Sequence, residues 1–214
     1  MRELLVYVAD KSMGEAVGGF LDRDQIHRII GCGSFEFDSR QDVKVASGQF
    51  DPGVYKRGNE LIRPYFNEYK HAVLIADEEW KGSPGADKMR VRLGEHLLDA
   101  GWSAEYCLPL VVCPEADVWL WSSSPHTATT LGWPSWDALR PALLAEGLLL
   151  EDQAKPSRPK ETAAWALKHS GKRIPWSSAL FRKISSKASV KRCEDPALLS
   201  LLEQLRLWFP LEAQ

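Results

Sequence analysis

Three short, continuous apolar runs limit what this chain can fold into. They are LLVYVA at residues 4–9, AVLIA at 72–76 and LPLVVC at 108–113, and all three are rich in Val, Leu and Ile. A strand covered by helices on both faces is apolar at every position, whereas a strand covered on one face alternates. The runs therefore predict three parallel strands inside an α/β sheet.

A helical pattern lies between the second and third runs. Met89, Leu93 and Leu97 recur at helical spacing, and Gly101 follows where such a helix would end. A strand, a helix and a second strand in this order form a βαβ unit, whose crossover is right-handed. The pattern therefore predicts that the second and third strands are parallel.

The segment after the first strand predicts another helix. Ser12 and Glu15 have the spacing of a capping box, which marks a helix start. Gly18 and Gly19 follow within the same helix. Because glycine lowers helix propensity and permits close approach, this helix is either weak or tightly packed against a neighbour.

The chain divides into an α/β part and a helical part. We expect residues 1–125 to form the α/β domain, with an irregular insertion at 25–60. Residues 126–214 should form a helical, basic region packed on that domain. Pro159 and Pro196 in this region stand where first helical turns begin. The predicted fold class is α/β, a mainly parallel sheet flanked by helices, with a helical basic C-terminal region.

Three short segments have local patterns that predict strands or turns. IHRIIGCGSFEF at residues 26–37 predicts a strand that turns at its glycines, and FDPGVY at 50–55 contains an Asp-Pro-Gly turn. Trp119 and Trp121 alternate around an intervening leucine, which predicts a strand with both rings on one face, most simply packed in the core.

Composition and missing motifs narrow the functional classes. No apolar run approaches the ~18–20 residues of a membrane-spanning helix, and the N-terminal apolar stretch is too short for a signal sequence. The four cysteines form no CxxC pair, which is typical of reduced thiols in the cytoplasm. The sequence contains no GxxxxGKS/T, GxGxxG, HExxH or GxSxG motif. We therefore expect a cytoplasmic protein without a membrane partner.

Acidic side chains follow each of the three predicted strands. Asp10 follows the first, Asp77 and Glu79 follow the second, and Glu115 and Asp117 follow the third. Ligand sites of parallel sheets lie at the carboxyl ends of the strands. Clustered carboxylates repel one another unless a cation neutralises them, and their hard oxygens favour Mg²⁺ or Mn²⁺. The pattern predicts a divalent-metal site suited to phosphate chemistry.

A simpler interpretation of these acids stays open. Strand ends lie at the surface, and a carboxylate there can cap the helix that follows. The spacing of Asp77 and Glu79 favours the metal site, because residues two apart in an extended segment point to the same side.

A strongly basic segment lies in the helical part. The range 155–192 carries eleven lysines and arginines and a single acid, Glu161, although the whole chain has a formal net charge of −2. Such a block indicates a polyanionic partner, the backbone of DNA or RNA, while a solvated helical surface is the alternative. The predicted nucleic-acid-binding residues are Lys155, Arg158, Lys160, Lys172, Arg173, Arg182 and Lys183.

Several segments together resemble a known group of proteins. These are VYVADKSMGEAVGGFL, HAVLIADEEWKGSPGA, VVCPEADVWLW, KPSRPKE and CEDPALLSLLEQLRLWFP. The chain resembles a family of small Toprim-like proteins, related to the fold of topoisomerases, primases and overcoming-lysogenization-defect nucleases. More specifically, it resembles an accessory component of a methylation-associated bacterial anti-phage defence system, encoded beside restriction-modification-like methylases.

This resemblance implies a function and a set of site residues. It implies an Mg²⁺- or Mn²⁺-dependent nuclease or phosphoryl-transfer enzyme that contacts nucleic acid and other defence proteins. The catalytic residues would be Asp77, Glu79, Asp10 and Glu115, and the metal ligands would be Asp77, Glu79, Glu115 and Asp117.

The first strand departs from the Toprim pattern. Toprim nucleases place a glutamate at the end of this strand, where the present chain has Ala9 followed by Asp10. A shift of one residue changes the face to which a side chain points. The alternative is therefore an inactive Toprim-like module that recruits, or senses for, methylase or nuclease partners.

Overall fold

The protein is described by a computed structural model that covers residues 1–121, 124–190 and 193–211. Its centre is a four-stranded sheet in the order β2-β1-β3-β4, and every neighbouring pair of strands is parallel. The strands are β1 (Arg2–Val8), β2 (Val43–Val45), β3 (Tyr69–Asp77) and β4 (Cys107–Val112). The predicted α/β class and parallel sheet are confirmed.

The three predicted strands correspond to β1, β3 and β4. The register aligns Val8 with Ile75 and Asp77 with Val112, so these strands end near one edge of the sheet. The sequence did not predict β2, because its three residues lie at the sheet edge and are half-buried or exposed.

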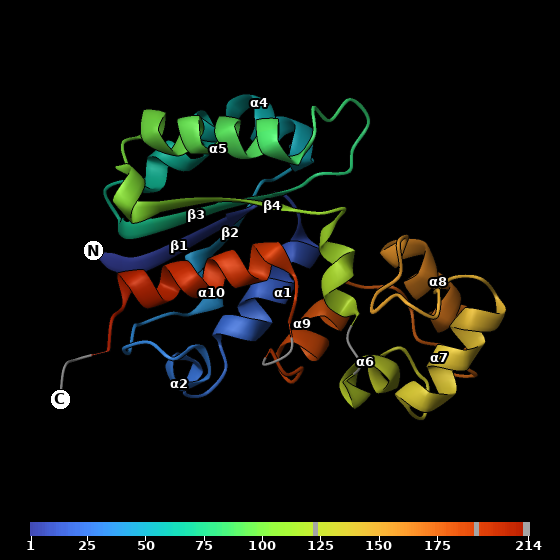
Figure 1. Ribbon diagram of the computed structural model, residues 1–214. Helices are drawn as coiled ribbons and strands as arrows, with labels where there is room; N and C mark the ends of the chain where they lie inside the picture. The colour runs from blue at the N-terminus through green and yellow to red at the C-terminus, as the bar shows by residue number, and fades with distance from the viewer. Residues whose placement is uncertain (122–123, 191–192, 212–214) are drawn as a thin grey trace.

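Helices cover both faces of the sheet (Figure 1). On one face lie α1 (Lys11–Leu21), α2 (Ile26–Ile30) and α10 (Pro196–Trp208), which pack against Val6 and Val73. On the other face lie α4 (Phe50–Ile62) and α5 (Ala86–Ala100), which pack against Leu5 and Leu74. Successive strand residues point to opposite faces, so both faces need apolar side chains.

A third apolar core lies beyond the carboxyl ends of the strands (Figure 1). Trp121, Leu139, Ala163 and Phe181 are buried in it. The elements around it are η3 (Ala116–Leu120), α6 (Pro125–Thr130), α7 (Trp136–Ala145), α8 (Pro159–His169) and α9 (Ala179–Ser185). Three further short elements are α3 (Ser39–Asp42), η1 (Arg63–Tyr65) and η2 (Ala104–Tyr106).

The predicted strand at 26–37 is wrong over its first part, which is the single helical turn α2. Ile26 and Ile30 are buried four residues apart, and Gly31 ends the turn with a positive φ of 79°. The predicted turn at 50–55 is also wrong, since α4 begins at Phe50. Pro52 lies in its first turn, where the missing N–H costs no hydrogen bond.

Two further local predictions differ from the structure. Trp119 lies in the 3₁₀ helix η3 and Trp121 is its C-cap, so the two rings do not alternate along a strand. Helix α1 is capped by Asp10, whose Oδ1 accepts a hydrogen bond from the Met13 amide at 2.9 Å, and not by Ser12. An aspartate just after a strand serves as an N-cap as well as a serine does.

The strand order places a topological switch point between β1 and β3. The segment after β1 continues into α1 on one face, while α4 leads into β3 from the other face. Ligands of open α/β sheets bind in the crevice outside the carboxyl ends at such a point. Among the described residues, no helix combines the length and apolar character needed to cross a membrane.

Candidate functional site

Carboxylates from four chain segments gather at the switch point. Asp10 follows β1, Asp51 lies in the first turn of α4, Asp77 ends β3, and Glu115 and Asp117 follow β4. Their charges are close enough to act on one another. Burial raises the pKa of Asp77 well above its usual range, and Asp51, Asp10 and Glu115 raise it further.

Asp77 is the buried centre of this group, with 6% of its surface exposed. Its Oδ1 accepts a hydrogen bond from the Ala116 amide at 2.8 Å, and its own amide donates to Asp51 Oδ1 at 2.7 Å. Asp77 therefore joins the end of β3 to α4 and to η3. Burial is also the largest cause that raises the pKa of Asp51, and the negative charge of Asp10 raises it further.

Asp117 has the least satisfied carboxylate of the group. It is buried, and its Oδ1 has no hydrogen-bond partner among the described residues. Burial raises the pKa of Asp117 to about 7, with a further contribution from the charge of Glu115, and Lys160 acts in the opposite direction. A buried oxygen without a partner is costly, so this position favours a proton or a cation.

Glu115 connects the acidic group to the basic region. Burial raises its pKa, Lys160 at the start of α8 lowers it, and Glu79 raises it again. Trp121 Nε1 donates to the Pro159 carbonyl at 3.0 Å, which ties η3 to the start of α8. The carboxylates and the exposed Lys160 therefore lie on adjoining elements.

Asp77 and Glu79 do not share one environment. Asp77 is buried, whereas Glu79 is exposed and its amide donates to the Pro114 carbonyl at 2.9 Å. The intervening Glu78 turns toward α5, where its Oε1 accepts from the Ala86 amide at 3.1 Å. Glu79 thus lies at the rim of the acidic group and not beside Asp77.

Helix capping, the simpler interpretation, accounts for part of the pattern. Asp10 caps α1 and Glu78 binds the first amide of α5. The capping bonds of Asp10 and Asp77 use one carboxylate oxygen each, so capping does not exclude a ligand role for the second oxygen.

The donor chemistry of the group fits a hard divalent cation. The acidic group offers only carboxylate oxygens, which Mg²⁺ and Mn²⁺ prefer, and the unpartnered Asp117 Oδ1 is one of them. As the side chains stand, no three acidic, histidine or cysteine residues among those described surround a common point in the manner of a metal site. Binding would therefore require rotation of side chains such as Glu115.

The predicted nucleic-acid-binding residues fall into two groups. Arg182 forms ion pairs with Glu15 and with Asp22, the latter at 2.9 Å, and Lys155 lies 3.8 Å from Asp195. Both side chains therefore already face acidic partners within the chain. The other five are exposed and have no ion pair with an acid among the described residues: Arg158, Lys160, Lys172, Arg173 and Lys183.

Sequence reasoning missed one member of the acidic group. The Asp-Pro-Gly pattern predicts a turn at Asp51, and the position of Asp51 near Asp77 depends on α4 beginning at Phe50. An acid directly before a proline is a helix-start signal and could have indicated it. Comparison with known proteins adds no further assignment, because no family model, curated protein or solved structure significantly matches this chain.

Proposed function

We propose that this protein is a Toprim-like, Mg²⁺- or Mn²⁺-dependent protein that acts on nucleic-acid phosphodiesters in bacterial anti-phage defence. One observation carries the proposal. Five carboxylates from four segments converge at the switch point, and one buried oxygen of Asp117 has no partner among the described residues. Such a group is favourable only when a proton or a cation compensates its charge.

Four acidic residues have separate roles in this proposal. Asp77 and Glu115 hold the cation, with Asp117 beside them, and Glu79 adds negative charge at the rim. A bound divalent ion would polarise the phosphoryl oxygens and neutralise charge that develops on them. Asp117 Oδ1 accepts the proton of the attacking water, since it lies beside the proposed cation and has no hydrogen-bond partner among the described residues.

The exposed bases supply contacts to the nucleic-acid backbone. Lys160 adjoins Glu115, so a phosphate held by Lys160 would lie next to the acidic group. Arg158 shares the start of α8, where free amides also favour phosphate. No base-reading motif accompanies these residues, so the contacts should be independent of base sequence.

Calorimetric titration with Mn²⁺ tests the metal site. We expect the wild-type protein to bind at the acidic group and Asp77→Asn to weaken binding at least about tenfold, since a charged ligand is lost. Asp24→Asn is the matched control, because Asp24 is an exposed aspartate between α1 and α2. Equal binding by wild type and both variants would exclude this site.

The second candidate is a catalytically inactive Toprim-like module that recruits or regulates methylase or nuclease partners. Two observations favour it: Ala9 stands where a glutamate is expected, and Asp10 and Asp77 already bind backbone amides. The two functions differ in one assay. In cells challenged with phage, a folded Asp77→Asn/Asp117→Asn protein should lose protection if catalysis is needed, and keep both protection and its partners if it is not.

A further inference from the structure

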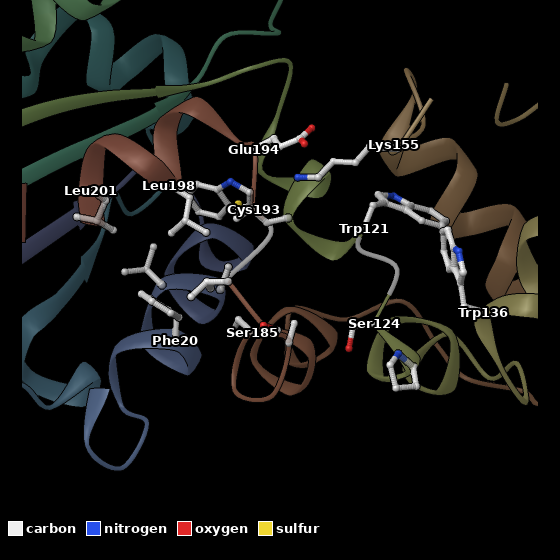
Figure 2. Close-up of a pocket in the computed structure, with 18 of the residues that line it drawn as sticks. Phe20, Trp121, Ser124, Trp136, Lys155, Ser185, Cys193, Glu194, Leu198 and Leu201 are labelled. Carbon is white, nitrogen blue, oxygen red and sulfur yellow. The ribbon is translucent and has the colours of Figure 1, made fainter. Parts of the chain in front are cut away.

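A cavity of about 640 Å³ is lined by residues of α1, η3, α6, α7, α9 and α10 (Figure 2). Its volume is in the range of small-molecule sites and far above a packing defect. Apolar and aromatic side chains form most of the wall: Val17, Phe20, Trp119, Trp121, Trp136, Leu198 and Leu201. Figure 2 shows Phe20, Leu198 and Leu201 on one side and Trp121 and Trp136 on the other.

Arg23 brings a positive charge to this apolar wall. Its Nε donates to the Ser185 carbonyl at 2.8 Å, and its Nη2 donates to the Ala188 carbonyl at 2.7 Å. The guanidinium carbon lies 5.0 Å from the centre of the Phe20 ring. These contacts fix the guanidinium in one position. The Ser185 carbonyl ends α9, and the partial negative charge at a helix C-terminus, about half an elementary charge, offsets only part of the guanidinium charge.

No acidic residue among those described pairs with Arg23. Burial lowers the pKa of Arg23, because part of its guanidinium is withdrawn from water. A half-buried cation without an anion is unfavourable, and proteins usually supply a carboxylate partner. Because Arg23 also lines the cavity, the part of its positive charge that these contacts leave uncompensated can act on an anion bound there.

The other charged groups around the cavity leave an excess of positive charge. Lys155 is 3.8 Å from Asp195, and Arg140 donates to the Glu151 carbonyl. Among the described residues that line the cavity, Glu194 is acidic, whereas Arg23, Arg140 and Lys155 are basic. It lies beside Lys155 at one margin, with Ser185 at the opposite margin (Figure 2).

We propose that this cavity binds a small amphipathic organic anion. Its carboxylate or similar headgroup accepts hydrogen bonds from Arg23, and its apolar body lies between Phe20, Leu198 and the tryptophans. The apolar body can be either an aliphatic chain or an aromatic ring, since both can pack against this wall. None of the five carboxylates of the acidic group lines this cavity. The proposed anion site therefore goes beyond the phosphodiester proposal, and either proposal can fail without the other.

Calorimetry with two matched pairs of probes tests the proposal. Octanoate is compared with 1-octanol, and 2-naphthoate with 2-naphthalenemethanol. We expect one site per chain and carboxylate binding about 10- to 100-fold tighter than binding of the corresponding alcohol, the range for a hydrogen bond to a charged group. The stronger of the two carboxylates identifies the apolar body as aliphatic or aromatic.

Two variants connect binding to this cavity. Arg23→Gln should remove the preference for the carboxylate and leave binding of the alcohol unchanged, whereas Arg28→Gln, at an exposed arginine on α2, should change neither. Ala154→Trp places a large ring at an exposed position on the wall and should weaken both classes of probe.

Three outcomes would overturn the proposal. They are equal binding of carboxylate and alcohol, an unchanged preference in Arg23→Gln, and no binding of any probe to the wild-type protein. If Arg23→Gln does not fold, as judged by circular dichroism, Ala154→Trp decides, and undiminished binding by that variant rejects the cavity.

Discussion

At the scale of single residues, Asp117 links stability to pH. An unfolded aspartate ionises near pH 4, whereas burial holds the pKa of Asp117 at about 7 in the folded protein. The unfolded chain therefore releases this proton first, and the contribution of Asp117 to stability falls as the pH rises from about 4 to 7.

Asp117→Asn should remove this loss. We expect the variant to be more stable than the wild type at pH 8, by at most about 4 kcal/mol, and the difference to shrink toward pH 4. Urea unfolding of both proteins at the two pH values measures it, with Asp24→Asn as a control that changes little. A difference that is the same at both pH values would contradict the assignment.

His71 links stability to pH in the opposite direction. Its ring stacks on Trp208 with centroids 4.5 Å apart, Tyr106 lies 5.4 Å away, and neither ring nitrogen has a hydrogen-bond partner among the described residues. Burial lowers the pKa of His71 to about 4, and Lys70 adds to this. The unfolded chain therefore takes up the proton first as the pH falls from about 6.5 to 4, and the fold loses stability.

His71→Phe should suppress part of this acid sensitivity. The wild type should lose up to about 3 kcal/mol through His71 between pH 7.5 and 4.5, a loss that the phenylalanine variant avoids. Parallel urea titrations at both pH values provide the test. If the two proteins lose stability equally on acidification, protonation of His71 does not contribute to the acid sensitivity of the fold.

At the scale of elements, the contact between α1 and α9 depends on glycine. A Cβ atom at Gly19 would lie 2.8 Å from the Arg182 carbonyl oxygen and even closer to Ser185 Oγ. Of the two interpretations of the glycines in this helix, close packing against a neighbour is the one that the structure confirms. The sequence could not name the neighbour, because α9 lies about 160 residues further along the chain.

Gly19→Ala should therefore destabilise the protein by about 1–3 kcal/mol, the usual cost of overpacking. Gly94→Ala on α5 is the matched control, since the nearest atom to its added Cβ would be at 3.6 Å. That substitution should be neutral or stabilise the protein by up to about 1 kcal/mol, because alanine favours the helix. Thermal unfolding of both variants compares them, and a similar loss in both would rule out a close contact specific to Gly19.

The predictability of each element follows from how its residues are buried. β1, β3 and β4 could be predicted because their interior positions are apolar on both faces. β2 could not, because its Val43-Lys44-Val45 sequence has no such pattern. The acids directly after these strands could be predicted from their position in the sequence. The place of Asp51 in the acidic group could not, because it depends on where α4 begins.

At the scale of the whole molecule, the exposed bases distinguish nucleic-acid binding from a solvated surface. Replacing Lys172, Arg173 and Lys183 by glutamine removes three exposed charges from the helical region. If they contact phosphates, the slope of log K against log salt for a single-stranded oligonucleotide should fall by about 2 in magnitude. Fluorescence anisotropy at several salt concentrations measures this slope.

A charge-matched control separates specific contacts from general electrostatics. Lys56, Arg57 and Lys88 are exposed on α4 and α5, in the layer on the opposite face of the sheet from α1 and α10. Replacing these three by glutamine lowers the net charge equally but should leave the salt slope nearly unchanged. Equal slopes for both triple variants would indicate a solvated surface.

The position of α10 has a consequence for how the chain folds as the ribosome makes it. All four strands are synthesised by residue 112, but Leu201, Leu202 and Leu205, which cover Leu110 and Val112, are added only with α10. Until then one face of the nascent sheet stays partly open to water. During translation that apolar surface is available to chaperones or to other nascent chains, and its closure waits for the last helix.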